Sequence, residues 1–350
     1  MGIPLIQRYR VARYVIGQKL RKRHRYPLVL MLEPIFRCNL ACAGCGKIEY
    51  PEEILNRCLS LDECLSALDE CGSPIVSIAG GEPLLHKEMP QLVAGIVERR
   101  RFVYLCTNGL LLKTHLKDYP PSPYLTISVH LDGNRERHDA LACQPGVYDR
   151  AVEAIQFASA KGFRVTLNCT LYEGVTAKEA AEHFDFAMSL GIEGITVSPG
   201  FCYAEAPQKE LFLKCTQSKQ LFRDIFKIGR RRKWRFNQSI LFLDFLAGNQ
   251  AYQCTPWGNP TRNPLGWQKP CYLLTGEGYA SSFKALIEET DWDRYGRGRN
   301  PKCANCMMHS GFEPTAVNDT LAHPLKAFFV YLYGPRINGP MAPEPPTASP

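Results

Sequence analysis

The sequence predicts an α/β protein whose parallel sheet closes part of a barrel. Six segments of strand length are rich in apolar residues, and they alternate with segments of helical pattern. Apolar strands of this kind are typical of a parallel sheet that is covered by helices. Six such units fall short of the eight that close a full barrel. The pattern is consistent with a partial (β/α)6 barrel, and functional groups are expected at the carboxyl ends of its strands.

The elements follow one another in a regular order along the chain. Strands are expected at residues 28–32, 74–79, 102–106, 124–131, 163–171 and 195–197. Helices are expected at residues 61–71, 88–100, 147–161, 176–190 and about 208–232. The helix at 61–71 has the clearest start, because Ser60 and Glu63 form the S-x-x-E pattern of a capping box.

Length and composition divide the chain into four parts. The 350 residues are 45% hydrophobic and 22% charged, which suits one large domain with a smaller addition. We expect a basic amphipathic segment at 1–26, the barrel at 27–235 and a cysteine-containing, loop-rich C-terminal domain at 236–333. Six prolines and few large residues predict a disordered tail at 334–350.

The net charge of +8 is concentrated at the N-terminus. Residues 1–27 contain eight arginines and lysines and no acid, and aliphatic and aromatic residues lie between them. Such a segment can lie on an anionic membrane surface. It can also bind the phosphates of a nucleic acid, or pack on the domain as a helix with a solvated basic face.

Cysteine usage indicates a reducing compartment. The chain has fifteen cysteines, no secretory signal and no run of eighteen apolar residues. Many thiols without export predict metal binding or catalysis in the cytoplasm.

The stretch around Cys38, Cys42 and Cys45 has the spacing C-x3-C-x2-C. Three thiolates can hold three irons of a [4Fe-4S] cluster and leave the fourth iron open. An open metal position favours chemistry, by the reasoning that separates catalytic from structural zinc sites. A structural zinc site is the alternative, and it needs a distant fourth ligand.

This spacing resembles the signature of the radical S-adenosylmethionine (SAM) enzymes, whose fold is a partial barrel. The resemblance implies that the open iron chelates the amino and carboxylate groups of SAM. Gly44 stands where the family usually has an aromatic residue, which removes one adenine contact. Gly80-Gly81-Glu82-Pro83 follows a strand and matches the motif that holds the SAM amino group. Further SAM contacts are expected from five polar residues at strand ends, Asn108, Ser128, His130, Asp132 and Asn168.

A second group of cysteines lies near the C-terminus. Cys303 and Cys306 form a C-x2-C pair, which Cys254 and Cys271 can complete to four thiolates. Such a set suits zinc or a second iron–sulfur cluster. His309 is a rival ligand, and four unligated thiols are the alternative.

A more specific resemblance is to the radical SAM enzymes of hopanoid biosynthesis, the adenosylhopane synthases. It is carried by Met31-Leu32-Glu33-Pro34, by Val129-His130-Leu131-Asp132-Gly133, and by residues 254–263, 291–296 and 298–303. It implies that the 5′-deoxyadenosyl group of SAM is added to the terminal alkene of diploptene, a pentacyclic hydrocarbon, to form adenosylhopane. The product would begin hopanoid side-chain extension.

This chemistry gives three further expectations. Cys106, at the end of the third strand, would give a hydrogen atom to the carbon radical that remains after addition; a small buried core cysteine is the alternative. An external one-electron reductant such as flavodoxin or ferredoxin would feed the cluster. Residues 1–26 would dock the barrel mouth at the inner face of the membrane, and nucleic acid becomes the less favoured partner.

Phe201, Tyr203, Trp257 and Trp267 are candidates for the substrate cavity, with core packing as their alternative. Two other functions stay open. One is a radical SAM enzyme that modifies a peptide or RNA. The other is a non-catalytic metal-binding scaffold, against which the Gly80–Pro83 turn argues.

Overall fold

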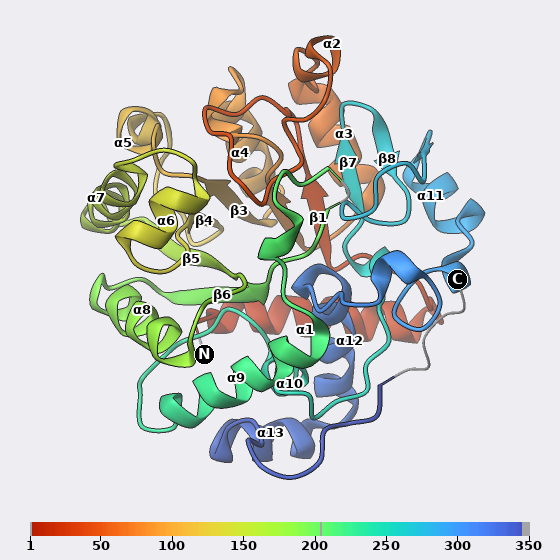
Figure 1. Cartoon of the computed structure of the whole chain (residues 1–350). Coiled ribbons are helices and arrows are strands. Elements are labelled where there is room, and N and C mark those ends of the chain that lie inside the picture. Colours follow the sequence, from red (N-terminus) through yellow and green to blue (C-terminus); the bar gives the residue numbers. More distant parts are fainter. Residues whose placement is uncertain (1, 204, 345–350) are drawn as a thin grey trace.

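The computed structural model describes residues 2–203 and 205–344 and contains the expected partial barrel. Its six barrel strands are β1 (Val29–Leu32), β2 (Ile75–Ile78), β3 (Phe102–Thr107), β4 (Leu125–His130), β5 (Arg164–Leu171) and β6 (Gly194–Pro199). Each pairs in parallel with the next, so their carboxyl ends lie at one edge of the sheet. Figure 1 shows the sheet curving around the molecule with helices outside it.

The helices that cover the barrel begin and end close to their predicted positions. They are α3 (Leu61–Cys71), α4 (Met89–Glu98), α7 (Val147–Ala160), α8 (Ala177–Ser189) and α9 (Cys215–Gly229). The capping box of α3 is present, because Ser60 Oγ accepts from the Glu63 N–H and the Glu63 carboxylate accepts from the Ser60 N–H. The last helix starts later than expected, because residues 209–211 form a separate 3-10 turn. Short helices that the sequence pattern missed are α2 (Glu52–Leu55), α5 (Leu112–His115) and α6 (Arg135–Leu141).

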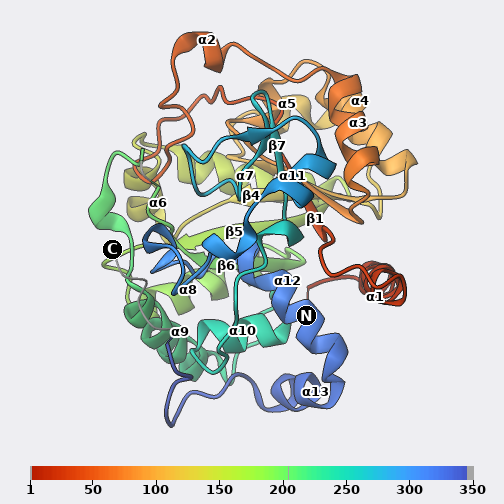
Figure 2. The same cartoon turned by 90° about the vertical axis from the view of Figure 1, so that its right-hand side faces the viewer.

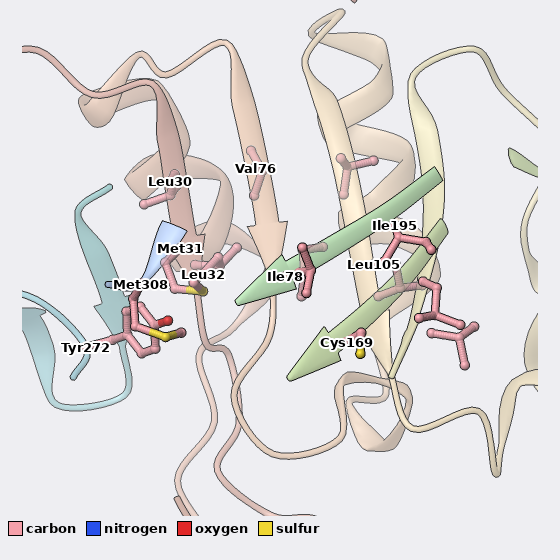
Figure 3. Packing of buried hydrophobic residues seen from close by; sticks show 14 of the residues in the cluster. Leu30, Met31, Leu32, Val76, Ile78, Leu105, Cys169, Ile195, Tyr272 and Met308 are labelled. Carbon is pink, nitrogen blue, oxygen red and sulfur yellow. The ribbon is translucent and has the colours of Figure 1, made fainter. Parts of the chain in front are cut away.

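Strands β4 and β5 alternate apolar and polar residues, which differs from the apolar strands that we expected, whereas β1 is apolar throughout. Val76, Ile78 and Leu105 point outward and pack under the helices (Figure 3). Successive side chains of a strand alternate between its faces, so Ser77 and Cys106 point into the barrel. Fully burying one of the outer side chains stabilises the fold by about 1.5–3 kcal/mol. The outer face therefore holds the barrel together and leaves the inner face free for polar groups.

The C-terminal segment continues the same sheet. Strand β7 (Thr261–Asn263) pairs in parallel with β1, and β8 (Gly266–Gln268) and β9 (Tyr279–Ala280) follow in antiparallel order. The helices of this segment are α10 (Ile240–Leu246), α11 (Phe283–Glu289), α12 (His309–Ala322) and α13 (Pro324–Tyr333). Met308, just before α12, packs near Met31 of β1 (Figure 3), and His309 bonds Ser198 of β6 at 2.9 Å. The start of α12 thus touches the first and the last barrel strand.

The predicted disordered tail is wrong for residues 334–344. Ala342 N–H donates to the Gly248 carbonyl at 2.7 Å, and Arg223 donates to the Gly339 carbonyl at 2.8 Å. Glu344 pairs with Lys219 and Arg297. The low apolar content of this stretch is compensated by backbone and ionic contacts to the domain. Residues 345–350 lie outside the described residues.

Helix α1 (Leu5–Leu20) lies at the amino ends of the strands. Gln7 donates to the Tyr104 hydroxyl at 2.9 Å, and Arg10 donates to the Arg100 carbonyl, just before β3, at 3.0 Å. These contacts hold α1 at the end of the barrel opposite its mouth, so α1 does not lie where it would dock the mouth at a membrane. Membrane contact by residues 1–26 stays a prediction. Among the described residues, no helix is long and apolar enough to span a bilayer.

Candidate active site

The three cysteines of the first motif lie together on the loop after β1. Cys38, Cys42 and Cys45 are each partly exposed. The N–H of Leu40 points at the sulfur of Cys38, and the N–H of Lys47 at the sulfur of Cys45. Burial and the neighbouring thiols raise the pKa of Cys42 to about 12. The apoprotein therefore keeps its thiols protonated, and a metal must displace these protons to bind.

The Gly80–Gly81 turn is pressed against the backbone that leads into this loop. Gly81 N–H donates to the Ile35 carbonyl and Glu82 N–H to the Arg37 carbonyl, both at 2.9 Å. A Cβ atom on Gly81 would lie 2.0 Å from the Arg37 backbone oxygen. This distance is too short for any residue that has a side chain. These glycines are thus required by the close approach of two loops, and they fix the position of the cysteine loop relative to β2.

The Glu82 carboxylate is buried and forms its hydrogen bonds within the protein. The side chain is 1% exposed and accepts from the Thr107 hydroxyl, the Asn108 N–H and the Leu84 N–H at 2.9–3.1 Å. Burial raises the pKa of Glu82 to about 6, although the backbone donors act in the opposite direction. The carboxylate therefore joins the turns after β2 and β3. Backbone carbonyls of the turn are the acceptors that remain for a ligand's ammonium.

Asn108 lies beside the cysteine loop, and Ser128 lies on the inner face of the sheet. The Asn108 amide lies 3.9 Å from the Cys38 sulfur and donates to the Asn39 side chain at 2.7 Å. Ser128 pairs in register with Cys106, so both point into the barrel. In the next strand Thr166 is in register with Ser128, and its buried hydroxyl has no hydrogen-bond partner among the described residues. The inner face therefore offers polar groups to a ligand at the carboxyl end of the sheet.

His130, Asp132 and Asn168 form a group of their own. His130 Nε2 lies 2.5 Å from Asp132 Oδ2, and the Asn168 amide lies 3.4 Å from His130 Nδ1. The other Asp132 oxygen accepts from the Thr170 N–H at 2.6 Å. Burial opposes ionisation of both, yet their mutual attraction lowers the pKa of Asp132 and raises that of His130. Asp132 thus tethers β4 to β5, and His130 and Asn168 remain beside the interior.

Tyr172, directly after β5, is a site residue that sequence reasoning missed. A Cβ atom on Gly44 would lie 2.8 Å from the Tyr172 hydroxyl, and one on Gly200 would lie 2.9 Å from the same ring. The ring also lies within electrostatic reach of Cys42 and Cys45. Two glycines from different loops therefore make room for one aromatic ring beside the cysteine loop. The glycine at position 44 was the only signal, and it gave no hint of which ring fills the space.

Comparison with known proteins decides the family. Residues 32–187 match the model of the radical SAM superfamily, and residues 195–330 match a domain of unknown function, DUF3463. Residues 32–187 therefore form a radical SAM domain. Domains of this family use a [4Fe-4S] cluster and SAM, which the predicted cofactors included.

The residues present fit these groups. The three thiols of the loop supply the donor set of a site-differentiated cluster. The free hydroxyl of Thr166 and the carbonyls beside Gly81 offer polar partners for a bound nucleoside and amino acid. The radical SAM domain would thus hold the cluster at Cys38, Cys42 and Cys45 and SAM along the adjoining strand ends.

Curated relatives match the barrel half of the chain. Fe-coproporphyrin III synthase of Methanosarcina barkeri is 31% identical over 39% of this chain and 35% of its own length. GTP 3′,8-cyclase of Aquifex aeolicus is 31% identical over 49% of this chain and 57% of its own length. The chain thus spans between a third and somewhat more than half of these relatives.

Solved structures share the fold. SuiB of Streptococcus suis, bound to its precursor peptide SuiA, matches with a TM-score of 0.65 at 16% identity, over 85% of this chain and 73% of that chain. The anSMEcpe structure with bound AdoMet matches with a TM-score of 0.57 at 14% identity, over 87% of this chain and 99% of that one. At such identities the similarity shows the radical SAM fold with its C-terminal extension and nothing finer.

The four C-terminal cysteines also lie together. Cys254, Cys271, Cys303 and Cys306 line one cavity of about 30 Å³. A Cβ atom on Gly311 would lie 2.6 Å from the Cys254 sulfur, so a glycine is needed there. His309, the rival ligand, does not line this cavity and bonds Ser198 instead.

The surroundings of this second set resemble those of the first. The sulfur of Cys271 accepts from the Leu273 N–H and that of Cys306 from the Met308 N–H, as Cys38 does from Leu40. Burial raises the pKa of Cys271 to about 12. Among the described residues, no three ligand side chains of either set already surround a single-ion position.

Two of the proposed cavity aromatics have other roles. Trp267 is 2% exposed and packs against Phe283, and Trp257 packs edge-on against Trp292. Both support the C-terminal segment. Tyr203 lies within electrostatic reach of Cys45. Phe201 packs edge-to-face on Tyr203, with ring centres 5.7 Å apart, and lines the cavity of the second cysteine set.

Proposed function

We propose that this radical SAM protein adds the 5′-deoxyadenosyl group of SAM to the terminal alkene of diploptene and so forms adenosylhopane. The observation that carries the proposal is Cys106. Its sulfur lies inside the barrel, 3.5 Å from the Ser77 hydroxyl and in register with Ser128. Burial raises the pKa of this thiol, so it keeps its hydrogen at neutral pH. A reaction that adds a radical to an alkene needs such a donor at its end.

The bound cluster would supply one electron that splits SAM into methionine and a 5′-deoxyadenosyl radical. Addition of this radical to the alkene leaves a tertiary carbon radical that lacks one hydrogen atom. The S–H group of Cys106 supplies that atom, because an S–H bond is weaker than an alkyl C–H bond. The sulfur radical then regains one electron and one proton. An external reductant such as flavodoxin or ferredoxin provides the electrons.

The mouth of the barrel offers an apolar wall for a hydrocarbon. Tyr172 packs edge-on against Phe212 with ring centres 5.8 Å apart, and Phe201 packs against Tyr203. Tyr203 lies within electrostatic reach of Cys45 and Tyr272. A ring system of fused cyclohexanes would bury its surface against these side chains, and the polar inner face would keep SAM below it.

We also propose that Tyr172 supplies the adenine contact which Gly44 cannot make. Its ring lies where a side chain at position 44 would be, beside the cysteine loop. Stacking of a base on an aromatic ring is typically worth about 1–3 kcal/mol.

The C-terminal cysteines are proposed to hold a second metal centre, either zinc or an iron–sulfur cluster. Support comes from four thiols that line one cavity. Iron, sulfide and zinc counts per chain distinguish the two centres.

The reaction is tested anaerobically with reconstituted protein, dithionite, SAM and detergent-solubilised diploptene. The expected product has the mass of diploptene plus adenosyl plus hydrogen. 5′-Deoxyadenosine as the sole product would leave the radical SAM assignment intact and overturn the substrate. A peptide substrate is the second candidate, because SuiB shares the fold over 85% of this chain. The observation that speaks against the scaffold hypothesis is the match of residues 32–187 to the radical SAM superfamily.

A further inference from the structure

Exposed apolar side chains gather on two helices. Of the fourteen large hydrophobic side chains exposed in the described part of the chain, five lie on α1 and six on α13. The five on α1 are Leu5, Ile6, Tyr9, Ile16 and Leu20. The six on α13 are Leu325, Phe328, Phe329, Tyr331, Leu332 and Tyr333. Such a concentration on two elements marks an interaction surface.

Helix α1 packs Val15 inward, but it exposes five other large apolar side chains and buries two amides. Gln7 and Gln18 are 3% and 6% exposed, whereas Leu5 and Leu20 are 77% and 79% exposed. Burying amides and exposing leucines is the reverse of what an ordinary surface helix does. The outer face of α1 is therefore built for contact with something apolar.

The two helices lie at the same end of the barrel. Helix α12 begins at the carboxyl end of β6, where His309 bonds Ser198, and runs to the amino end, where Tyr26 donates to Asn318 at 2.6 Å. Val317 and Leu321, near the end of α12, pack with Val15 of α1. Helix α13 starts directly after this contact. Figure 2 shows α1 at the right of the molecule and α13 at the lower right, on either side of the end of α12.

The charge of this end is complementary to an anionic surface. Beside α1 lies a groove of about 1400 Å³, which is lined by six arginines, Arg10, Arg13, Arg21, Arg23, Arg25 and Arg101. Its acids are already engaged: Asp69 pairs with Arg99, Glu70 accepts from the Phe283 N–H, and Glu288 faces Lys284. On α13, Lys326 is the single charged residue.

We propose that α1 and α13 together form a docking face for an anionic bilayer. The apolar side chains of both helices enter the headgroup region, and the arginines of the groove bind lipid phosphates. The phenylalanines and tyrosines of α13 suit this depth, because aromatic rings concentrate at membrane interfaces. The barrel mouth then points away from the bilayer, so a lipid substrate leaves the membrane before it reaches the cysteine loop. This face does not depend on the reaction proposed above.

The test is co-flotation of the full chain with vesicles. Vesicles of phosphatidylcholine mixed with phosphatidylglycerol are compared with vesicles of pure phosphatidylcholine, at low and high salt. Wild-type protein is expected to float with the anionic vesicles and to be released by salt. Equal binding to both vesicles, or binding to neither, overturns the proposal.

Two variants test the parts of the face. The triple variant Phe328→Ser, Phe329→Ser, Leu332→Ser removes apolar side chains that are each more than half exposed, so the fold is kept. It is expected to lower vesicle affinity by at least about tenfold. The variant Arg13→Gln, Lys19→Gln, Arg21→Gln is expected to remove the preference for anionic lipid.

The matched control is Leu85→Ser with Ile228→Ser, which removes two side chains that are each 38% exposed and lie on other elements. It is expected to float like the wild type. A control that loses as much binding as the α13 variant overturns the proposal. So does a wild-type dimer that covers α13, seen as α13-dependent dimerisation in sedimentation without vesicle binding.

Discussion

The two cysteine sets differ in number and in access. Cys38, Cys42 and Cys45 lie on one partly exposed loop at the barrel mouth, whereas four cysteines from distant parts of the chain line a cavity, with Cys303 and Cys306 buried. Lys47 lies within electrostatic reach of both Cys45 and Cys271, so the sets are neighbours. Three thiols leave a metal position for a substrate, and four leave none. We therefore expect a reactive centre at the first set and a closed one at the second, and the following variants test this difference.

The largest effect is expected from Cys42→Ala. Loss of one of three cluster ligands should lower SAM cleavage by more than about a hundredfold, because even outer-shell changes cost tenfold to a hundredfold. Iron content and 5′-deoxyadenosine formation are the measurements. Cys58→Ala is the control, since Cys58 is exposed and outside both sets. Retained cleavage in Cys42→Ala would remove the first set from the reaction.

The variant Cys306→Ala removes one thiol of the second cysteine set. It should lower the stability of the protein more than it lowers SAM cleavage. A structural metal contributes its binding free energy to folding. We expect the metal count to fall and the thermal midpoint to drop by about 5 °C or more, since 1 kcal/mol corresponds to roughly 2–4 °C for a domain of this size. Cys202→Ala, at an exposed thiol, is the control. An unchanged metal count and midpoint would mean that the four thiols are unligated.

A third thiol, Cys106, belongs to neither set and should affect the product alone. Cys106→Ala and Cys106→Ser should both cleave SAM at the wild-type rate, and the saturated adduct should become a minor product. Serine keeps the size of the side chain, but its O–H bond is too strong to give up a hydrogen atom. Cys169→Ala is the matched control, because Cys169 is buried on the outer face of β5. The donor role is wrong if the Cys106 variants give the wild-type product mixture.

The smallest effect is expected from Tyr172, the aromatic residue beside the first cysteine set. Tyr172→Ala should weaken SAM binding by roughly tenfold, within the range of base stacking, and Tyr172→Phe should not. Equilibrium dialysis of SAM measures this without turnover. Gly44→Phe alone should also bind poorly, because its side chain meets Tyr172. The double variant Gly44→Phe, Tyr172→Ala should recover affinity. Wild-type affinity in Tyr172→Ala, or no recovery in the double variant, would end this assignment.

Much of the fold and part of the site could be predicted from local sequence. The strands and the covering helices follow from apolar segments and from signals such as Ser60 and Glu63. The first cysteine set follows from spacing within eight residues. The second set was predicted as a group although its members are far apart, and its shared cavity is seen only in the structure.

What the sequence by itself determined is the order of the elements, the family motifs and the residue types available for chemistry. These depend on short-range pattern, because each strand and turn is specified by neighbours along the chain. Tertiary structure alone decided how side chains are used. It engaged Glu82 with Thr107 and Asp132 with Thr170, brought Tyr172 beside Gly44, and set α1 at the end of the barrel opposite its mouth. The reason is that these contacts form only when barrel closure brings distant segments together, and no local pattern records which of several polar partners will then be nearest.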